Sequence, residues 1–223
     1  MKTNEPPSAR EQVLHRIRAA NEGTSDAATV TTGWSALARD YKRSATQSRA
    51  GILSLLEDRL LDYEAQVIRS TPADVVRCVA ERLAARGKQR LVVPAGFPAE
   101  WLPPGFTFVL DDSMTPTELD QVDGVITSST VAIAETGTVV LQNVPGQGRR
   151  AATLVPDYHL CLVSAGDVVE TVPEALARLQ ATATLSTTFV SGPSATADIE
   201  MTRIKGVHGP RCLDVILIVC EME

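Results

Sequence analysis

Apolar residues recur along this chain at two spacings, and each spacing predicts one kind of element. Helical spacing predicts helices over residues 9–21, 48–62, 72–87 and 172–182, and the Thr115-Pro116-x-Glu118 pattern predicts a further helix start. Short runs rich in Val, Ile and Leu predict strands over residues 64–69, 91–94, 106–110, 124–127, 137–141, 151–155, 159–164, 188–191 and 214–220. Strands that alternate with helices favour an α/β fold with layers and a largely parallel sheet.

The first 47 residues differ from the rest. Ser8 and Glu11 match a capping box ahead of the first helix, whereas residues 23–32 are small and polar and predict a mobile linker. Trp34 and Tyr41 suit a short helical turn. We therefore expect an N-terminal helical arm over residues 1–47 and one α/β domain over residues 48–223, which should fold without the arm.

Composition narrows the function classes. The formal net charge of -6 argues against broad contact with nucleic acid or an anionic membrane. No apolar run is long enough to span a membrane, and the first residues lack the apolar segment of a signal peptide, so a cytoplasmic location is expected. The four cysteines form no CxxC pair, so we expect no iron–sulfur cluster or zinc held by this chain alone, and no cofactor.

The stretch 123–142, DGVITSSTVAIAETGTVVLQ, holds the first candidate site. Two predicted strands flank hydroxyl groups and a single glutamate, and an isolated carboxylate in an apolar run is a clue to function. We take Glu135 as a candidate catalytic residue and Ser128, Ser129, Thr136 and Gly137 as candidate ligand contacts. The alternative is a polar turn whose carboxylate is satisfied by backbone amides.

A second candidate is the glycine-rich sequence at residues 146–151, which matches G-x-G-x-x-A. A dinucleotide loop requires a helix directly after the glycines, but a strand-like run with Pro156 follows here, which excludes a Rossmann site. Arg149 and Arg150 remain candidate anion contacts, although a flexible exposed loop with solvated arginines fits the pattern better.

Residues 191–198, SGPSATAD, follow a predicted strand and form the third candidate. Small residues let backbone amides approach a ligand, and a helix that opened at Ser194 would favour an anion. The candidate ligand contacts are Gly192, Pro193, Ser194 and Asp198, with His208 from the later Gly-Val-His-Gly-Pro sequence. A tight turn with a helix cap is the compatible alternative, and His159, inside a strand run, suits core packing.

Three motifs in register resemble one family. D-G-V-I-T-x-x-x-x-A-I-A-E-T-G-T-V-V-L, T-L-V-P-D-Y-H and S-G-P-S-x-T-A-D-I-E with G-V-H-G-P together resemble the lactate-utilisation protein C (LutC/YkgG) family with its LUD domain, over roughly residues 48–220. Ser128-Ser129-Thr130 departs from the Gly, Cys or Asp expected there, and the cysteine-rich segment of the larger iron–sulfur members is absent from this sequence.

The resemblance implies a fold similar to the NagB/RpiA/CoA-transferase-like superfamily. It also implies an accessory role in oxidation of L-lactate to pyruvate beside iron–sulfur partner proteins, with a small carboxylate ligand and a homo-oligomer as further expectations. Two alternatives stay open: a stand-alone CoA-transferase-like or sugar-phosphate-type enzyme, and an organic-acid-sensing module. In the first, Glu135-Thr136-Gly137 looks like the glutamate arrangement of CoA transferases. We expect Glu135 to face a pocket whose other wall is residues 191–198.

Overall fold

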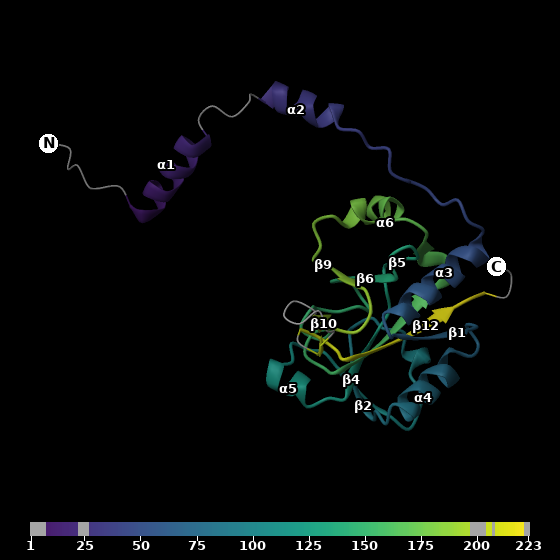
Figure 1. Ribbon diagram of the computed structural model, residues 1–223. Helices are drawn as coiled ribbons and strands as arrows, with labels where there is room; N and C mark the ends of the chain where they lie inside the picture. The colour runs from purple at the N-terminus through teal and green to yellow at the C-terminus, as the bar shows by residue number, and fades with distance from the viewer. Residues whose placement is uncertain (1–7, 22–26, 197–203, 207, 221–223) are drawn as a thin grey trace. The chain divides into compact units, whose positions relative to one another are not determined.

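The computed structural model describes residues 8–21, 27–196, 204–206 and 208–220, and divides the chain into two units, Met1–Tyr41 and Lys42–Glu223 (Figure 1). The first unit holds α1 (Ala9–Asn21) and α2 (Ala27–Ala36), and α1 buries none of its side chains. The predicted linker at residues 23–32 is therefore wrong for residues 27–32, which are helical. Residues 22–26 lie outside the described part of the chain.

The second unit is built on a six-stranded parallel sheet in the order β1-β12-β7-β4-β2-β3. Its strands are β1 (Gln66–Ser70), β2 (Arg90–Val93), β3 (Thr107–Leu110), β4 (Gly124–Thr127), β7 (Tyr158–Ser164) and β12 (Cys212–Ile218). Parallel strands covered on both faces need continuous apolar runs, which is what the central strands supply. The predicted layered α/β fold with a largely parallel sheet is confirmed.

A second sheet of four strands lies in the order β8-β5-β6-β9. It consists of β5 (Val131–Ile133), β6 (Thr138–Gln142), β8 (Val168–Val169) and β9 (Thr187–Val190), and β6 pairs antiparallel with both β5 and β9. The stretch 123–142 thus contributes β4 to the first sheet and a β5–β6 hairpin to the second. A two-residue hydrogen-bonded pair, β10 (Ala195–Thr196) with β11 (Ile204–Lys205), forms a third, small sheet.

Three helices of the second unit begin at a residue whose side chain caps them. Ser48 caps α3 (Arg49–Asp62), and Thr115 and Thr171 form capping boxes at the starts of α5 (Pro116–Asp120) and α6 (Val172–Leu179). The remaining helical segments are α4 (Val75–Ala85), η1 (Ala99–Trp101), η2 (Ala165–Asp167) and η3 (Gln180–Thr182). None of the helices in the described residues is long and apolar enough to cross a membrane.

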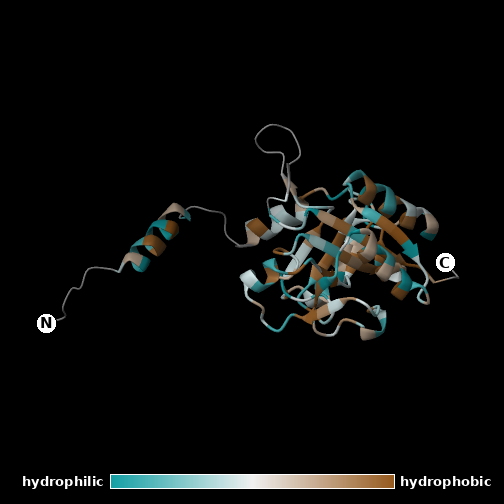
Figure 2. Ribbon diagram, turned by 90° about the horizontal axis from the view of Figure 1, so that it is seen from below, coloured by the Kyte–Doolittle hydropathy of each residue, from teal (hydrophilic) through white to brown (hydrophobic). Residues whose placement is uncertain are grey.

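Two apolar cores cover the two faces of the parallel sheet. One face, with Leu160, Leu162 and Ile216, packs against α4. The opposite face, with Cys161 and Leu217, packs against α3 and the second sheet. Hydrophobic strands at the centre of this unit are visible in Figure 2. Layers on both sides of one sheet leave the ends of its strands as the places where polar groups gather.

The predicted strand at residues 151–155 is wrong. This segment folds into turns closed by local hydrogen bonds, from Ala152 N to Arg149 O at 3.1 Å and from Val155 N to Ala151 O at 3.1 Å. The expectation of solvated arginines before it also fails for Arg149, whose guanidinium binds the carboxylate of Asp111 at 2.7 and 2.8 Å. The loop is thereby tied to the end of β3.

Candidate functional site

One cavity of about 300 Å³ brings together three of the sequence motifs. Its described lining comes from the 150–159 region, from β9 and the turn after it, from the 208–210 segment and from Leu213 of β12. It therefore opens beside the amino ends of β7 and β12, where the edge strand of the second sheet passes. Ligands of open parallel sheets more often bind at the carboxyl ends.

The floor of the cavity is set by sheet register. His159 is the second residue of β7 and pairs with Leu213 of β12 on one side and Val125 of β4 on the other. The His159 side chain is only 2% exposed, yet it lines the cavity, and its Nε2 lies 2.8 Å from Thr127 Oγ1. Burial, aided by the positive charge of Arg150, lowers the pKa of His159 to about 4. The imidazole is neutral at pH 7.

Arg150 supplies positive charge to the cavity. One guanidinium nitrogen, Nη1, donates to the Thr153 carbonyl at 3.0 Å and to the Thr153 hydroxyl at 3.2 Å. Within the described chain no carboxylate pairs with it, and burial lowers its pKa. An arginine that is partly desolvated and lacks an acidic partner favours an anionic ligand. The reason is that a carboxylate can replace the lost water contacts of the guanidinium with charge-assisted hydrogen bonds.

The opposite wall is a turn that requires glycine. Gly192 has φ of 86°, and a Cβ there would lie 2.4 Å from the Cβ of Tyr63. Ser194 holds the next segment, since its Oγ accepts from His208 N at 3.1 Å and its amide donates to Pro210 O at 2.8 Å. The predicted ligand contacts Gly192, Pro193, Ser194 and His208 all line this cavity. No helix opens at Ser194, because β10 begins at the next residue.

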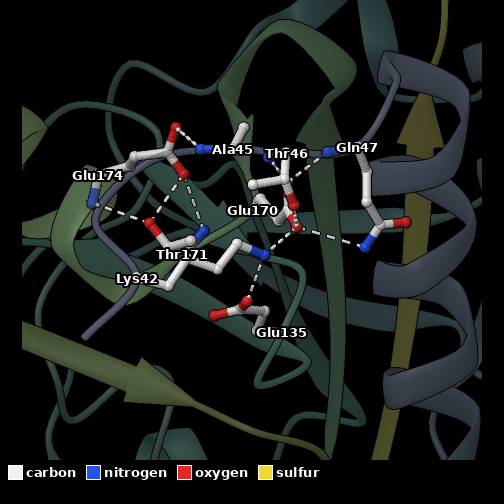
Figure 3. A network of polar contacts seen from close by, with 8 residues as sticks. All are labelled: Lys42, Ala45, Thr46, Gln47, Glu135, Glu170, Thr171 and Glu174. Atoms are coloured by element: carbon white, nitrogen blue, oxygen red, sulfur yellow. Dashed lines mark hydrogen bonds and ion pairs between the residues drawn. The ribbon is translucent and has the colours of Figure 1, made fainter. Parts of the chain in front are cut away.

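Other predicted site residues lie elsewhere. Glu135 is not among the described residues that line the cavity, so in the described part of the chain it does not share this cavity with the turn at residues 191–195. It lies in the turn between β5 and β6, and its Oε1 accepts from Lys42 Nζ at 2.8 Å (Figure 3). Thr136 and Gly137 share this turn, and a Cβ on Gly137 would lie 2.8 Å from the Cβ of Arg59. Gly137 thus serves close packing with α3.

Ser128 and Ser129 follow β4, at the carboxyl end of the sheet. Ser129 Oγ donates to Leu162 O at 3.4 Å, and the Ser128 carbonyl accepts a long contact of 3.8 Å from Cys161 Sγ. Neither serine lines the cavity. Asp198 lies outside the described residues. Of the candidates named from the sequence, four therefore line this cavity, and five, Glu135 included, are not among its described lining residues.

A buried carboxylate that sequence reasoning missed is Glu170, directly after β8. It is completely buried and accepts hydrogen bonds from the amides of Thr46 at 2.6 Å and Gln47 at 3.0 Å, and from Lys42 (Figure 3). These donors hold the pKa of Glu170 down to about 2. Ala45 N donates to Glu174 at 3.1 Å beside it. We call residues 42–47 the strap, because this network ties them to the second sheet.

Thr153 and His159 line the site without having been named as ligand contacts, whereas Arg150 was named only as a candidate anion contact that a solvated loop position fitted better. The turn at residues 151–155, taken from its apolar composition for a strand, concealed the fact that Arg150 and Thr153 face the cavity together. One sequence signal for this wall was available: the pair Arg149-Arg150 lies just before the Thr153–His159 motif. Among the described residues no cluster of His, Cys, Asp and Glu could hold a metal ion.

Known proteins resemble this chain over most of its length. The family model described as "LUD domain" matches residues 38–218. The chain belongs to the LUD domain family. Lactate utilization protein C of Deinococcus radiodurans is 42% identical to it over 181 residues, covering 80% of this chain and 84% of the relative. Lactate utilization protein C of Geobacillus thermodenitrificans is 30% identical over 188 residues, covering 74% and 78%.

A solved structure agrees with the LUD domain assignment. The crystal structure of a DUF162 family protein from Deinococcus radiodurans at 1.70 Å resolution is 38% identical and superimposes with a TM-score of 0.69. The match covers 78% of this chain and all of that one. The cavity described above is built from residues that lie inside the matched LUD domain.

Proposed function

We propose that this protein serves lactate utilization as an accessory subunit in oxidation of L-lactate to pyruvate, together with iron–sulfur partner proteins in the cytoplasm. Support comes from relatives named lactate utilization protein C, which match most of the chain. We propose further that the cavity binds a small carboxylate. This role needs no redox group in the chain, since the partners supply it.

The observation that carries the ligand proposal is the chemistry of the cavity wall. Arg150 is a cation without a described acidic partner, and no Asp or Glu occurs among the described lining residues. Thr153, Ser191 and Ser194, each with a hydroxyl group, line the same cavity. A monocarboxylate with one further oxygen fits this set, because its carboxylate can pair with the guanidinium while its other oxygen binds a hydroxyl or imidazole.

Isothermal titration calorimetry with sodium L-lactate tests the ligand. Arg150→Met should weaken binding at least about tenfold, because a charge-assisted pair is lost. Arg178→Met is the matched control: Arg178 lies on α6 with its guanidinium 3.9 Å from Asp167 and does not line the cavity. A wild-type protein that binds neither L-lactate nor pyruvate would contradict the ligand proposal.

Co-expression with the iron–sulfur proteins of the lactate system tests the partner role. The tagged full chain should co-purify with them in a fixed ratio, and a strain that lacks this gene should grow poorly on L-lactate until the gene is restored. Elution of the chain alone, with unchanged growth of the deletion strain, would contradict the accessory role.

The geometry around Glu135 does not support the CoA-transferase-like alternative. A nucleophilic glutamate must meet its substrate, whereas the Glu135 carboxylate is engaged by Lys42 and no described cavity is lined by it.

A further inference from the structure

A directional chain of hydrogen bonds lies beneath the cavity. Cys161 Sγ donates to the carbonyl of Ser128 at 3.8 Å, and Thr127 Oγ1 donates to Cys161 Sγ at 3.6 Å. A carbonyl can only accept, which settles the direction at that end. Burial raises the pKa of Cys161 to about 12, so the thiol keeps the proton that it donates.

The direction of the chain bears on the tautomer of His159, because the 2.8 Å contact between Thr127 Oγ1 and His159 Nε2 forms with either ring nitrogen protonated. Thr127 has a single hydroxyl proton, and when that proton is directed at Cys161 Sγ, the Thr127 oxygen accepts at the 2.8 Å contact with His159. The donor is then His159 Nε2–H. A neutral imidazole with its proton on Nε2 carries a lone pair on Nδ1. Nε2 is engaged by Thr127, and no hydrogen bond to Nδ1 is found among the described residues, so Nδ1 is the ring nitrogen of this cavity-lining residue that is left for a ligand.

We propose that His159 carries its proton on Nε2 and that its Nδ1 accepts a hydrogen bond from the ligand hydroxyl, so that the cavity selects 2-hydroxy acids over 2-oxo acids. This rests on the proposed carboxylate site. Arg150 binds the carboxylate in both ligand classes, because both carry one. Only the hydroxy acid offers a proton to Nδ1, whereas the keto oxygen of a 2-oxo acid would set a lone pair against a lone pair. A buried acceptor left unmatched in this way discriminates between the two ligands.

Thr127 and Cys161 are positioning residues in this account. Both are fully buried on the face of the sheet that carries His159, and the two residues pair directly across β4 and β7. They touch no ligand. Their effect on selectivity comes only from the direction in which the hydroxyl and thiol protons point.

Histidine ring ¹⁵N NMR of the full chain at pH 7 tests the tautomer without any ligand. The sequence has three histidines, so spectra of His15→Gln and His208→Gln assign the His159 signals. We expect a neutral ring with the proton on Nε2. A ring with the proton on Nδ1, or a charged ring, would overturn the inference and leave the proposed carboxylate site standing.

Calorimetry at pH 7 with L-lactate and pyruvate as probes tests the selectivity. We expect the wild type to prefer L-lactate about tenfold. Thr127→Val should bring the two affinities close together, while Thr127→Ser and Cys161→Ser, which keep a donor in the chain, should retain the preference. Equal affinities in the wild type, or tighter binding of pyruvate, would overturn the inference alone. Failure of both probes to bind would overturn the proposed ligand site and this inference with it.

Discussion

His159 shows at the scale of one residue how burial controls chemistry. A histidine in the core that stays neutral must bind its proton much more weakly than in the unfolded chain, and its pKa of about 4 lies below the ordinary value of 6.5. Between these two values the unfolded state binds more protons than the folded state. The free energy of unfolding therefore falls as the pH is lowered through this window.

We predict that lowering the pH from 6.5 to 5 costs about 2 kcal/mol of stability through His159. Urea denaturation at the two pH values measures the change. His159→Gln should remove most of this pH dependence, while His208→Gln should not, because His208 is exposed. A His159→Gln protein with the same pH dependence as the wild type would show that other groups are responsible.

At Glu135, a structural role and a catalytic role lead to different experimental results. Its carboxylate and Lys42 form an ion pair in which each side chain is 37% exposed, and exposed pairs contribute little. We predict that Glu135→Gln and Lys42→Met both leave L-lactate affinity unchanged, and that Glu135→Gln changes the Tm only slightly. Calorimetry and thermal melts provide the readouts. Loss of lactate-dependent growth in Glu135→Gln with unchanged stability would restore Glu135 as a catalytic candidate.

Part of the candidate site could be predicted from residue patterns in the sequence. Small residues around Gly192 and Ser194 indicated a turn near a ligand, and that turn lines the cavity. Glu135 does not line that cavity, because it lies in the turn between β5 and β6, where Lys42 pairs with its carboxylate. Spacing along one strand cannot reveal such a reversal when both arms are apolar.

At the scale of elements, the strap is the segment that sequence patterns describe least well. It has no apolar stripe, so it reads as part of the arm, and the boundary at residue 47 remains a prediction. In the structure its backbone amides satisfy the buried Glu170 carboxylate. A buried charge that loses its donors is costly, and this makes the exact end of a truncation important.

We predict that a chain starting at Lys42 keeps the stability of the second unit, while a chain starting at Ser48 melts several degrees lower. The second truncation removes Lys42 and the amides of Thr46 and Gln47 from Glu170. Adding Glu170→Gln to the shorter chain should recover part of the loss, because no charge is left buried. Equal melting temperatures for the two truncations would contradict this account of the strap.

Low pH should also weaken the contact between the strap and Glu170, in a pH range different from that of His159. The pKa of Glu170, about 2, lies below its ordinary value of 4.5, so its contribution is complete above pH 4.5 and is lost as the pH falls toward 2. The His159 window lies above this one, between about 4 and 6.5. The two groups can therefore be told apart in one pH series.

On the scale of the whole molecule, one core joins the two sheets of the second unit. Val139 of β6 and Leu217 of β12 belong to the same buried cluster, together with Leu56 of α3. Sheets that share a core lose their support together, so the Lys42–Glu223 unit should unfold in one transition.

We predict that Leu217→Ala lowers the free energy of unfolding by about 3 kcal/mol, because a fully buried leucine leaves a cavity. Hydrogen exchange should then show faster exchange in both sheets. Leu61→Ala, at an exposed position of α3, is the control and should have little effect. Loss of protection confined to β1, β7 and β12 would show that the second sheet is stable by itself.

The parallel sheet could be predicted from the sequence, since its buried strands are continuous apolar runs between helices. The division into two sheets could not, because strands of both sheets look alike in composition. The three-residue β5 has too few residues to show a period, and the turns at 151–155 are apolar because they pack on the core. Tertiary burial, not local preference, decides such segments.

In mechanical terms, the strap makes Glu170 the point at which a load on residues 1–41 enters the second unit. The chain continues directly from Tyr41 into Lys42, and three of the strap's contacts, from Lys42, Thr46 and Gln47, converge on the Glu170 carboxylate beside β8. Several hydrogen bonds that converge on one buried group share a force and resist it together until that group is freed. A pulling experiment from the amino terminus should therefore show a first, separate rupture event when the strap leaves Glu170, before the sheets yield, and Glu170→Gln should lower the force at which it occurs.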